Sequence, residues 1–268
     1  MNDKQSLRSN DLKFLKVAKQ AALEAGKIIS KYLGEDLDKK NKNGDHSNFV
    51  TAADLESEKA ILKILHKNYP KFNYIAEEKG ISDLGSDYTW VIDPLDGTIA
   101  FSVGLPTYTV SIGLLHKNNP ILGVIYHVVP KDLYHAAIGK GAYLNGKKIK
   151  VSQTKKLDGA ILGIDFAHRE KRMSKTQKYI LPLIDKIRYP FALGGDVLMM
   201  ALIGRGSFDG FANEANIWNC IAGAIIVTEA GGKVTDSKGA KINWSKKRLE
   251  IVASNGVLHN QILDVLKT

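Results

Sequence analysis

The sequence is poor in several features that define whole classes of proteins. Its 268 residues contain a single cysteine, Cys220, so no disulfide can form within the chain. No uninterrupted apolar run is long enough to cross a bilayer, and the polar start, residues 1–10, has no apolar stretch of the kind found in a secretion signal. These absences argue against a disulfide scaffold, a membrane protein and a secreted protein, and we expect a soluble, cytoplasmic chain.

Signals based on histidine and aromatic residues are also weak. The seven histidines show no metal-ligand spacing of the His-Glu-x-x-His type, and no basic stripe interleaved with aromatics indicates stacking on nucleic-acid bases. The formal net charge is +10, but the lysines are dispersed along the chain. Two interpretations stay open: an anionic partner, either nucleic acid or a phosphorylated metabolite, or a lysine-rich surface without a specific partner.

What the sequence does have is a globular composition, with 44% apolar and 25% charged residues, and two patterns that meet near residue 152. Apolar spacing predicts helices over 11–32, which Asp11 would cap, and over 53–69, with a polar loop or hairpin at 39–48 between them. Strands are predicted over 72–76, 90–92, 108–116, 121–129 and 133–138, before an Asn145-Gly146 hairpin turn. Strands over 160–165, 207–212 and 249–253 then alternate with helices over 175–186, 195–204, 218–230 and 257–266. We therefore predict two parts, a helix pair with an antiparallel sheet (1–151) and an α/β part (152–268).

The segment Trp90-Val-Ile-Asp93-Pro-Leu-Asp96-Gly97-Thr98 carries the clearest chemical signal. An apolar strand runs straight into two carboxylates, and Gly97 permits a tight turn. Two carboxylates this close repel each other unless a cation lies between them, and hard oxygen ligands on a short turn suit Mg²⁺. Residues 95–98 alone are typical of an ordinary turn. Only the whole segment after the apolar strand is specific.

This segment closely resembles the signature of the inositol monophosphatase family of Mg²⁺-dependent phosphatases. Four further segments resemble motifs of that family and follow in the family's order, at 49–54, 74–78, 139–146 and 218–232. The resemblance implies an α/β fold built as a layered α-β-α-β-α sandwich, hydrolysis of a small phosphomonoester by metal-activated water, and a homodimer.

The resemblance also implies two or three Mg²⁺ ions in each active site. Glu77 and Asp93, with the backbone carbonyl of Leu95, would hold the first ion, and Asp93 and Asp96 would hold the second. Asn219 departs from the family, which usually has an Asp there as a ligand of the second ion. An amide keeps a carbonyl oxygen but lacks the negative charge of a carboxylate. The attraction between two unit charges about 4 Å apart is worth about 4 kcal/mol at an effective dielectric constant of about 20. We expect Asn219 to be a weaker ligand, the alternative being a second ion that binds only with the substrate phosphate or not at all.

The reacting groups follow from the same resemblance. The backbone amides of Gly97 and Thr98 would receive the phosphate, near a helix N-terminus. Asp54 and Thr98 would orient the attacking water, with Glu77 as part of the catalytic set, and no phosphoenzyme is needed. Asp196, at the start of a predicted helix, either faces the substrate or caps its helix, and both interpretations stay open.

The residues that would select the substrate are less clear. The family often has a Glu near Ala212 that contacts substrate hydroxyls, whereas here Glu214 lies two positions further on. The segment Ala100-Phe-Ser-Val-Gly-Leu-Pro106 and the triplet Gly194-Gly-Asp196 look like the family's histidinol-phosphatase branch. Inositol 1-phosphate is the leading substrate and histidinol phosphate the alternative. Some relatives act with RNA or the transcription machinery, so a regulatory homologue that binds RNA or protein is the competing hypothesis.

Overall fold

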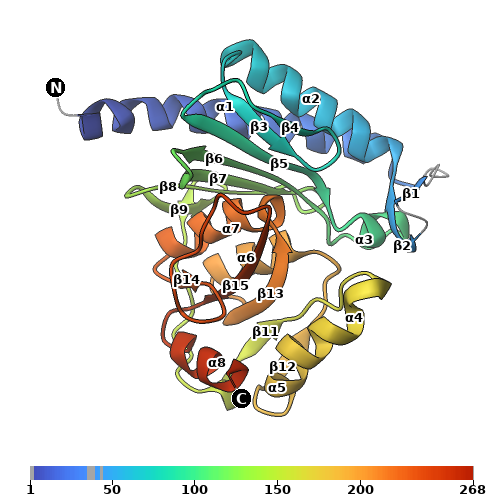
Figure 1. Ribbon diagram of the computed structural model, residues 1–268, viewed down its shortest axis with the longest axis vertical. Helices are drawn as coiled ribbons and strands as arrows, with labels where there is room; N and C mark the ends of the chain where they lie inside the picture. The colour runs from blue at the N-terminus through green and yellow to red at the C-terminus, as the bar shows by residue number, and fades with distance from the viewer. Residues whose placement is uncertain (1–2, 35–39, 43–44, 268) are drawn as a thin grey trace.

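The chain folds into stacked layers of helices and sheets, which Figure 1 shows in order from top to bottom. The computed structural model describes residues 3–34, 40–42 and 45–267. Its helices are α1 (Asp3–Lys31), α2 (Ala52–Asn68), α3 (Thr98–Ser102), α4 (Arg169–Lys175), α5 (Leu181–Ile184), α6 (Asp196–Gly204), α7 (Ile217–Glu229) and α8 (His259–Leu266). The pair α1 and α2 covers one face of a large sheet, α6 and α7 lie between this sheet and a smaller one, and α8, α4 and α5 lie beyond the smaller sheet. The predicted α/β class and α-β-α-β-α layering are confirmed.

The large sheet has the strand order β10-β9-β8-β7-β6-β5-β3-β4, and its only parallel neighbours among the described strands are β3 and β5. The strands are β3 (Asn73–Ala76), β4 (Gly80–Ser82), β5 (Tyr88–Asp96), β6 (Thr109–His116), β7 (Asn119–His127), β8 (Asp132–Ala137), β9 (Gly141–Leu144) and β10 (Lys147–Lys148). The hairpin turn is confirmed, because Asn145 and Gly146 both have the positive φ that a two-residue turn requires. The short strand β4 was not predicted.

The helix pair differs from the prediction at its ends. Helix α1 begins at Asp3, so Asp11 lies inside the helix and the predicted cap there is wrong. Apolar spacing predicted both helices, and most of the apolar side chains concerned are buried, including Ile29 in α1, but Leu12 and Leu55 are 57% and 46% exposed. Strands β1 (Lys40–Lys42) and β2 (Asp45–Val50) form an antiparallel pair where a loop or hairpin was expected over 39–48, and β2 runs two residues beyond that segment. Residues 39, 43 and 44 lie outside the described residues.

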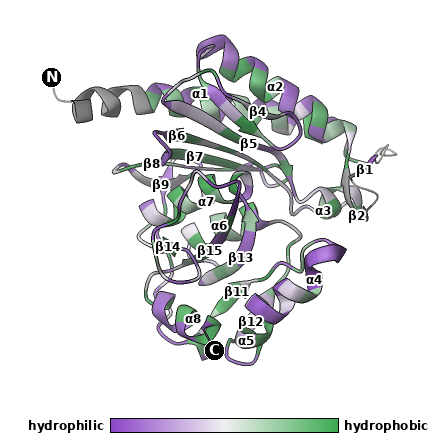
Figure 2. Cartoon of the chain, viewed as in Figure 1, coloured by the Kyte–Doolittle hydropathy of each residue, from purple (hydrophilic) through white to green (hydrophobic). Residues whose placement is uncertain are grey.

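Helix α7 is buried on nearly all sides because it lies between the two sheets. Figure 2 shows it as one of the more hydrophobic elements of the fold. Gly123 in β7 allows the close contact, since a Cβ there would lie 2.6 Å from the carbonyl oxygen of Ala222. Cys220 is fully buried in this helix. The first turn of α7 contacts the end of β5 through Asn219.

The smaller sheet has the order β12-β11-β13-β15-β14, with β11 parallel to both of its neighbours. Its strands are β11 (Ile161–Gly163), β12 (Tyr189–Phe191), β13 (Gly210–Asn216), β14 (Lys233–Thr235) and β15 (Arg248–Ser254). The strand predicted over 207–212 therefore lies three to four residues later, and β12 and β14 were not predicted. No helix in the described part of the chain is long and apolar enough to cross a membrane.

The helix predicted over 175–186 was wrong in its bounds. It begins at Arg169 as α4, passes through a π-helical turn (Thr176–Ile180) and ends as α5 at Ile184. Pro182 lies in the first turn of α5 and cannot donate a backbone hydrogen bond, which favours the irregular turn just before it. The division near residue 152 stays a prediction. One apolar cluster joins Val91 of the large sheet to Ile221 of α7 and Phe211 of the smaller sheet, across that boundary.

Candidate active site

The two carboxylates of the signature segment lie at the end of β5, buried in the sheet. Asp93 is fully buried and Asp96 is 6% exposed. The pairing of β5 with β6 is interrupted between Asp93 and Asp96, where Pro94 provides no backbone donor. The backbone N–H of Leu95 donates to Asp93 Oδ1 at 3.1 Å. This irregularity brings both carboxylates to one edge of the sheet.

Gly97 turns the chain from β5 into the short helix α3. Its φ of +89° lies in the left-handed region, and a Cβ would lie 2.9 Å from the carbonyl oxygen of Thr107. The next residue, Thr98, begins α3. Gly97 and Thr98 therefore lie at a helix start, where the sequence placed them.

Thr98 connects this turn to Asp54 at the start of α2. The Thr98 hydroxyl lies 3.2 Å from Asp54 Oδ1 and 3.1 Å from the carbonyl oxygen of Leu95, and can donate to either. Asp54 Oδ2 accepts from the backbone N–H and the hydroxyl of Thr51, at 2.8 and 2.6 Å. Burial raises the pKa of Asp54 to about 7, against these hydrogen bonds, which lower it. The predicted pair of Asp54 and Thr98 is therefore in contact.

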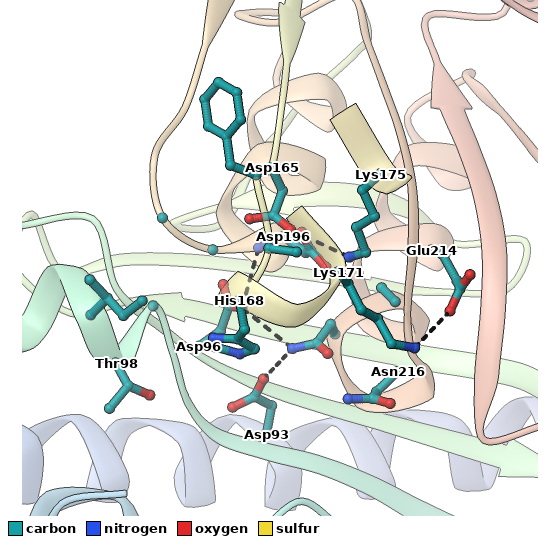
Figure 3. Close-up of a pocket in the computed structure, with 18 of the residues that line it drawn as sticks. Asp93, Asp96, Thr98, Asp165, His168, Lys171, Lys175, Asp196, Glu214 and Asn216 are labelled. Carbon is teal, nitrogen blue, oxygen red and sulfur yellow. Dashed lines mark hydrogen bonds and ion pairs between the residues drawn. The ribbon is translucent and has the colours of Figure 1, made fainter. Parts of the chain in front are cut away.

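A cavity of about 550 Å³ opens beside these residues, and Figure 3 shows the side chains that line it. One wall is acidic and carries Glu77, which follows β3, together with Asp93 and Asp96. Leu95, Gly97, Thr98, Asp196 and Asn219 line the same cavity. Asp54 is not among the residues that line the cavity and reaches it only through Thr98.

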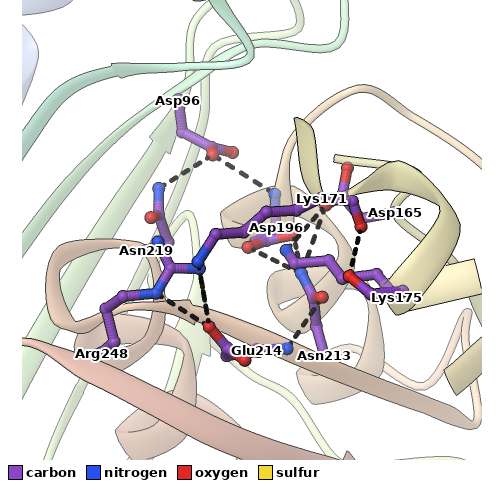
Figure 4. A network of polar contacts seen from close by, with 10 residues as sticks. Asp96, Asp165, Lys171, Lys175, Asp196, Asn213, Glu214, Asn219 and Arg248 are labelled. Carbon is purple, nitrogen blue, oxygen red and sulfur yellow. Dashed lines mark hydrogen bonds and ion pairs between the residues drawn. The ribbon is translucent and has the colours of Figure 1, made fainter. Parts of the chain in front are cut away.

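Asn219 enters this wall from the first turn of α7. Its Nδ2 donates to Asp93 Oδ2 at 2.8 Å and to Asp96 Oδ1 at 3.4 Å. The side chain expected to offer an oxygen to a second cation thus places an N–H donor between the two carboxylates. Figure 4 shows the contact with Asp96.

Asp96 is also attached to the start of α6. Its Oδ1 accepts from the backbone N–H of Asp196 at 3.2 Å, and its Oδ2 accepts from the N–H of Val197 at 3.1 Å. Gly195 permits this approach, because a Cβ there would lie 2.3 Å from Asp96 Oδ2. The carboxylate satisfies two backbone donors that an α-helix leaves unpaired at its N-terminus.

Asp196 does not cap its own helix through its side chain. Its carboxylate accepts from Asn213 Nδ2, at 3.0 and 3.2 Å, and faces the cavity. The same Nδ2 lies 3.3 Å from Asp165 Oδ2, and Lys175 Nζ lies 3.5 Å from that oxygen. Asp196 therefore lines the cavity as one of a cluster of four polar residues (Figure 4), and its contact with the substrate stays a prediction.

The wall opposite the acidic residues consists of ion pairs. Glu214 Oε1 lies 2.8 Å from Arg248 and 3.6 Å from Lys171 Nζ. Glu214, in doubt from the sequence, does line the cavity. Lys171 and Lys175 are one helical turn apart on α4, so both reach the cavity from the same face of that helix.

Burial and mutual repulsion dominate the electrostatics of the acidic wall. Burial raises the pKa of Asp93 well above its usual range, with further contributions from the charges of Glu77 and Asp96. Burial raises the pKa of Asp96 to about 7, although the backbone N–H of Val197 lowers it. A cation would relieve this repulsion, and carboxylate and carbonyl oxygens are ligands that Mg²⁺ prefers.

The donors fit one such ion better than two. Glu77, Asp93 and the carbonyl of Leu95 offer oxygens only, whereas an amide N–H stands between Asp93 and Asp96. Among the described residues, no three Asp, Glu, His or Cys side chains form a ready metal-binding group. A cation beside Glu77 and Asp93 would therefore need a ligand from the main chain, such as the carbonyl of Leu95.

The sequence analysis missed several charged residues of this cavity, among them Asp165, Lys171, Lys175 and Arg248. One signal was present, because Asp165 ends a predicted strand, and strand ends beside a sheet edge commonly carry ligand-binding residues. The two lysines gave no such signal, because the predicted helix began too late to place them both on one face.

Comparisons with known proteins identify the family of the chain. The sequence model of the inositol monophosphatase family matches residues 10–268. A protein of Aquifex aeolicus named fructose-1,6-bisphosphatase/inositol-1-monophosphatase is 35% identical over 260 residues, which are 95% of this chain and 96% of that protein. A Pseudomonas aeruginosa protein named Nus factor SuhB is 36% identical over 261 residues, 94% of this chain and 95% of that one.

Solved structures show the same fold. The extragenic suppressor protein SuhB from Bartonella henselae superposes with a TM-score of 0.88 at 30% identity, covering 96% of this chain and 99% of that one. The inositol monophosphatase from Anabaena superposes with a TM-score of 0.84 at 33% identity, covering 96% of each chain. The match of the family's sequence model over nearly the whole chain, with relatives above 30% identity along it, shows that this chain belongs to the inositol monophosphatase family.

Proposed function

We propose that the chain is a Mg²⁺-dependent phosphatase that hydrolyses a small phosphomonoester, with inositol 1-phosphate as the leading substrate. The observation that carries the proposal is the set of oxygens in one cavity, which is lined by Glu77, Asp93, Asp96 and Thr98, with Thr98 in contact with Asp54. Membership of the family supports a metal-dependent phosphatase in general. The substrate and the residue roles below are our inference.

Glu77, Asp93 and the carbonyl of Leu95 would hold a Mg²⁺ ion. When bound, such an ion lowers the pKa of a coordinated water and neutralises charge that develops on the phosphate. Asp96 would add negative charge next to this ion while its oxygens stay on the N-terminus of α6. The roles of the chain's own residues are then to orient water and to place the phosphate.

Thr98 and Asp54 would orient the attacking water. When the Thr98 hydroxyl donates its hydrogen to Asp54 Oδ1, its lone pairs can accept from a water in the cavity. Asp54 is held in place by two hydrogen bonds from Thr51, which fixes the direction of the Thr98 hydroxyl. The phosphate would lie at the start of α3, on the backbone amides of Gly97 and Thr98.

The wall of ion pairs supports a substrate with hydroxyl groups. Lys171 and Arg248 are paired with Glu214, and Lys175 is paired with Asp165, so this wall presents both donors and acceptors with its charges largely balanced. Such a wall suits neutral hydroxyls better than a second phosphate group. Asp165 and Asp196 could instead accept from an amine, which keeps histidinol phosphate as the alternative substrate.

A regulatory function is the second candidate, because relatives over 94% of this chain are named Nus factor SuhB. The net charge of +10 is compatible with an RNA partner. A filter-binding assay over a salt series would test it, because phosphate contacts by lysine and arginine make RNA binding fall steeply with salt. The homodimer is proposed from the family resemblance alone, and light scattering on the purified chain would test it.

Phosphate release with Mg²⁺ tests the enzymatic proposal. The substrates would be inositol 1-phosphate, histidinol phosphate, adenosine bisphosphate and fructose bisphosphate, and the Asp93→Asn variant would be the blank. We expect Mg²⁺-dependent release from inositol 1-phosphate above the other substrates, and none in the blank. Release equal to the blank for every substrate would reject the phosphatase proposal for this panel and favour the regulatory one.

A further inference from the structure

The position of the Asn219 amide limits how many cations the acidic wall can hold. Shape alone does not distinguish the nitrogen of an Asn amide from its oxygen, but the neighbours do. Asp93 Oδ2 and Asp96 Oδ1 are carboxylate oxygens that accept hydrogen bonds when ionised, so the nitrogen is the atom that can face both. The amide thus bridges the carboxylates as a donor, in the place where a second cation would contact both.

A cation could take that place only if Asn219 turned away and gave up its hydrogen bond to Asp93 and its longer contact with Asp96. The oxygen that would replace the nitrogen carries no full charge. The acidic wall then supplies three carboxylates, Glu77, Asp93 and Asp96, and a single divalent cation already neutralises most of their charge. A second divalent cation would leave the wall with an excess of positive charge in the absence of a bound anion.

Asp96 has little freedom to compensate. Each of its oxygens accepts from a backbone N–H of α6, and Gly195 packs directly against the carboxylate. Asp196, whose backbone N–H binds Asp96, has both side-chain oxygens on Asn213. No described carboxylate is therefore placed to supply the charge that position 219 lacks.

We propose that the phosphate-free protein binds one divalent cation, between Glu77, Asp93 and the carbonyl of Leu95, and that the Asn219 amide takes the place of a second. The inference rests on the metal site of the proposed function and specifies its composition. A carboxylate at position 219 would remove the bridging donor and add a charge, and so would restore a second site.

Binding of Mn²⁺, followed by the electron paramagnetic resonance signal of the free ion in phosphate-free buffer, counts the ions without reference to activity. For the full chain we expect one ion, with any second ion bound at least about 100-fold more weakly. The Asn219→Asp variant should bind two ions with dissociation constants within about tenfold of each other. The matched control is Asn216→Asp, which adds the same charge to the same cavity at the residue before α7 and should still bind one.

Each result decides something. Two ions of similar affinity in the unmodified chain would overturn the inference and leave the phosphatase proposal standing, and this measurement does not depend on any variant folding. A second ion gained by Asn216→Asp as readily as by Asn219→Asp would also overturn it, because charge and not the bridging position would then be responsible. So would a single ion in a folded Asn219→Asp variant. Failure of the unmodified chain to bind any Mn²⁺ would instead reject the metal-dependent function itself.

Discussion

The contact between Gly195 and Asp96 makes a sharp test of how the site is assembled. A methyl group at position 195 would lie 2.3 Å from Asp96 Oδ2 and 2.9 Å from its Cγ, so Gly195→Ala must displace the carboxylate. The backbone tolerates alanine, because φ at Gly195 is −159°, which is ordinary extended backbone. The displacement would break the hydrogen bonds to Asp96 from the backbone N–H groups of Asp196 and Val197.

Each hydrogen bond to a charged group contributes about 1.5–3 kcal/mol, so losing one or both should lower the free energy of unfolding by about 2–5 kcal/mol. Urea denaturation at pH 8 with a chelator present measures this effect without a contribution from bound metal. Alanine in place of glycine at the residue before a helix accounts for up to about 1 kcal/mol by itself. A loss below that value would therefore refute the proposed role of the Asp96 contact.

The matched control is Gly159→Ala. A Cβ at Gly159 would lie 3.6 Å from a methyl group of Thr154, which is an ordinary van der Waals distance, and its φ is not positive. This substitution should change the free energy of unfolding by less than about 1 kcal/mol. If both variants lost the same stability, the loss in Gly195→Ala would reflect glycine chemistry in general and not the contact with Asp96.

Three further predictions test other parts of the molecule. Thr98→Val keeps the shape of the side chain but removes the hydroxyl that contacts Asp54. The kcat on the best substrate should fall about 10²–10³-fold while the number of bound Mn²⁺ ions stays the same, and a fall in kcat below threefold would contradict the role of Thr98. Burial lowers the pKa of His259 to about 4, below its unfolded value of about 6.5. Between these two pH values the unfolded chain takes up a proton that the folded chain does not, so up to about 3 kcal/mol of the stability present above pH 6.5 should be lost as the pH falls towards 4. Urea denaturation at pH 7 and 4.5 should show a smaller loss in His259→Gln than in the unmodified chain, and equal losses would contradict the assignment. Lys175→Met should lower the free energy of unfolding by about 2–3 kcal/mol, because it leaves Asp165 without its cation. Adding Asp165→Asn should recover at least half of that loss, and a double-mutant cycle that showed no coupling between the two residues would contradict the prediction.

The part of the acidic wall at the end of β5 could be predicted from the sequence because its residues lie close together along the chain, whereas Glu77 was assigned from the family resemblance. One apolar strand and the turn after it supply Asp93, Leu95, Asp96, Gly97 and Thr98, so the proximity of these residues depends on a single turn. The order of the helices and most strands followed from apolar spacing for a similar reason, since each pattern is local. The layered arrangement itself came from the family resemblance, because apolar spacing does not fix which face of a sheet a helix covers.

The opposite wall could not be predicted, because it depends on contacts between distant segments. Glu214 in β13, Lys171 in α4 and Arg248 in β15 meet only after the smaller sheet has formed. The late start predicted for α4 has a different cause, since Met173 is the only apolar residue of this helix and apolar spacing therefore does not mark it. Asn219 was identified from sequence as a departure, but the direction of its amide depends on Asp96 being held by α6, which no local pattern shows.

The two walls of the cavity come from different parts of the fold, so the choice of substrate could change while the hydrolytic residues stay the same. The residues proposed to carry out hydrolysis come from β5, the start of α3, α2 and the segment after β3, and are fixed by the large sheet and by the buried ends of α6 and α7. The residues proposed to contact the rest of the substrate come largely from α4 and the smaller sheet, and three of them lie in one ion-paired group. Because such a surface group can be replaced without repacking the core, substitutions at Lys171, Glu214 and Arg248 should alter KM and the choice among phosphomonoesters more than kcat. A substitution at Thr98 should instead lower kcat more than it alters KM, because its partner Asp54 is buried and connected to the start of α2.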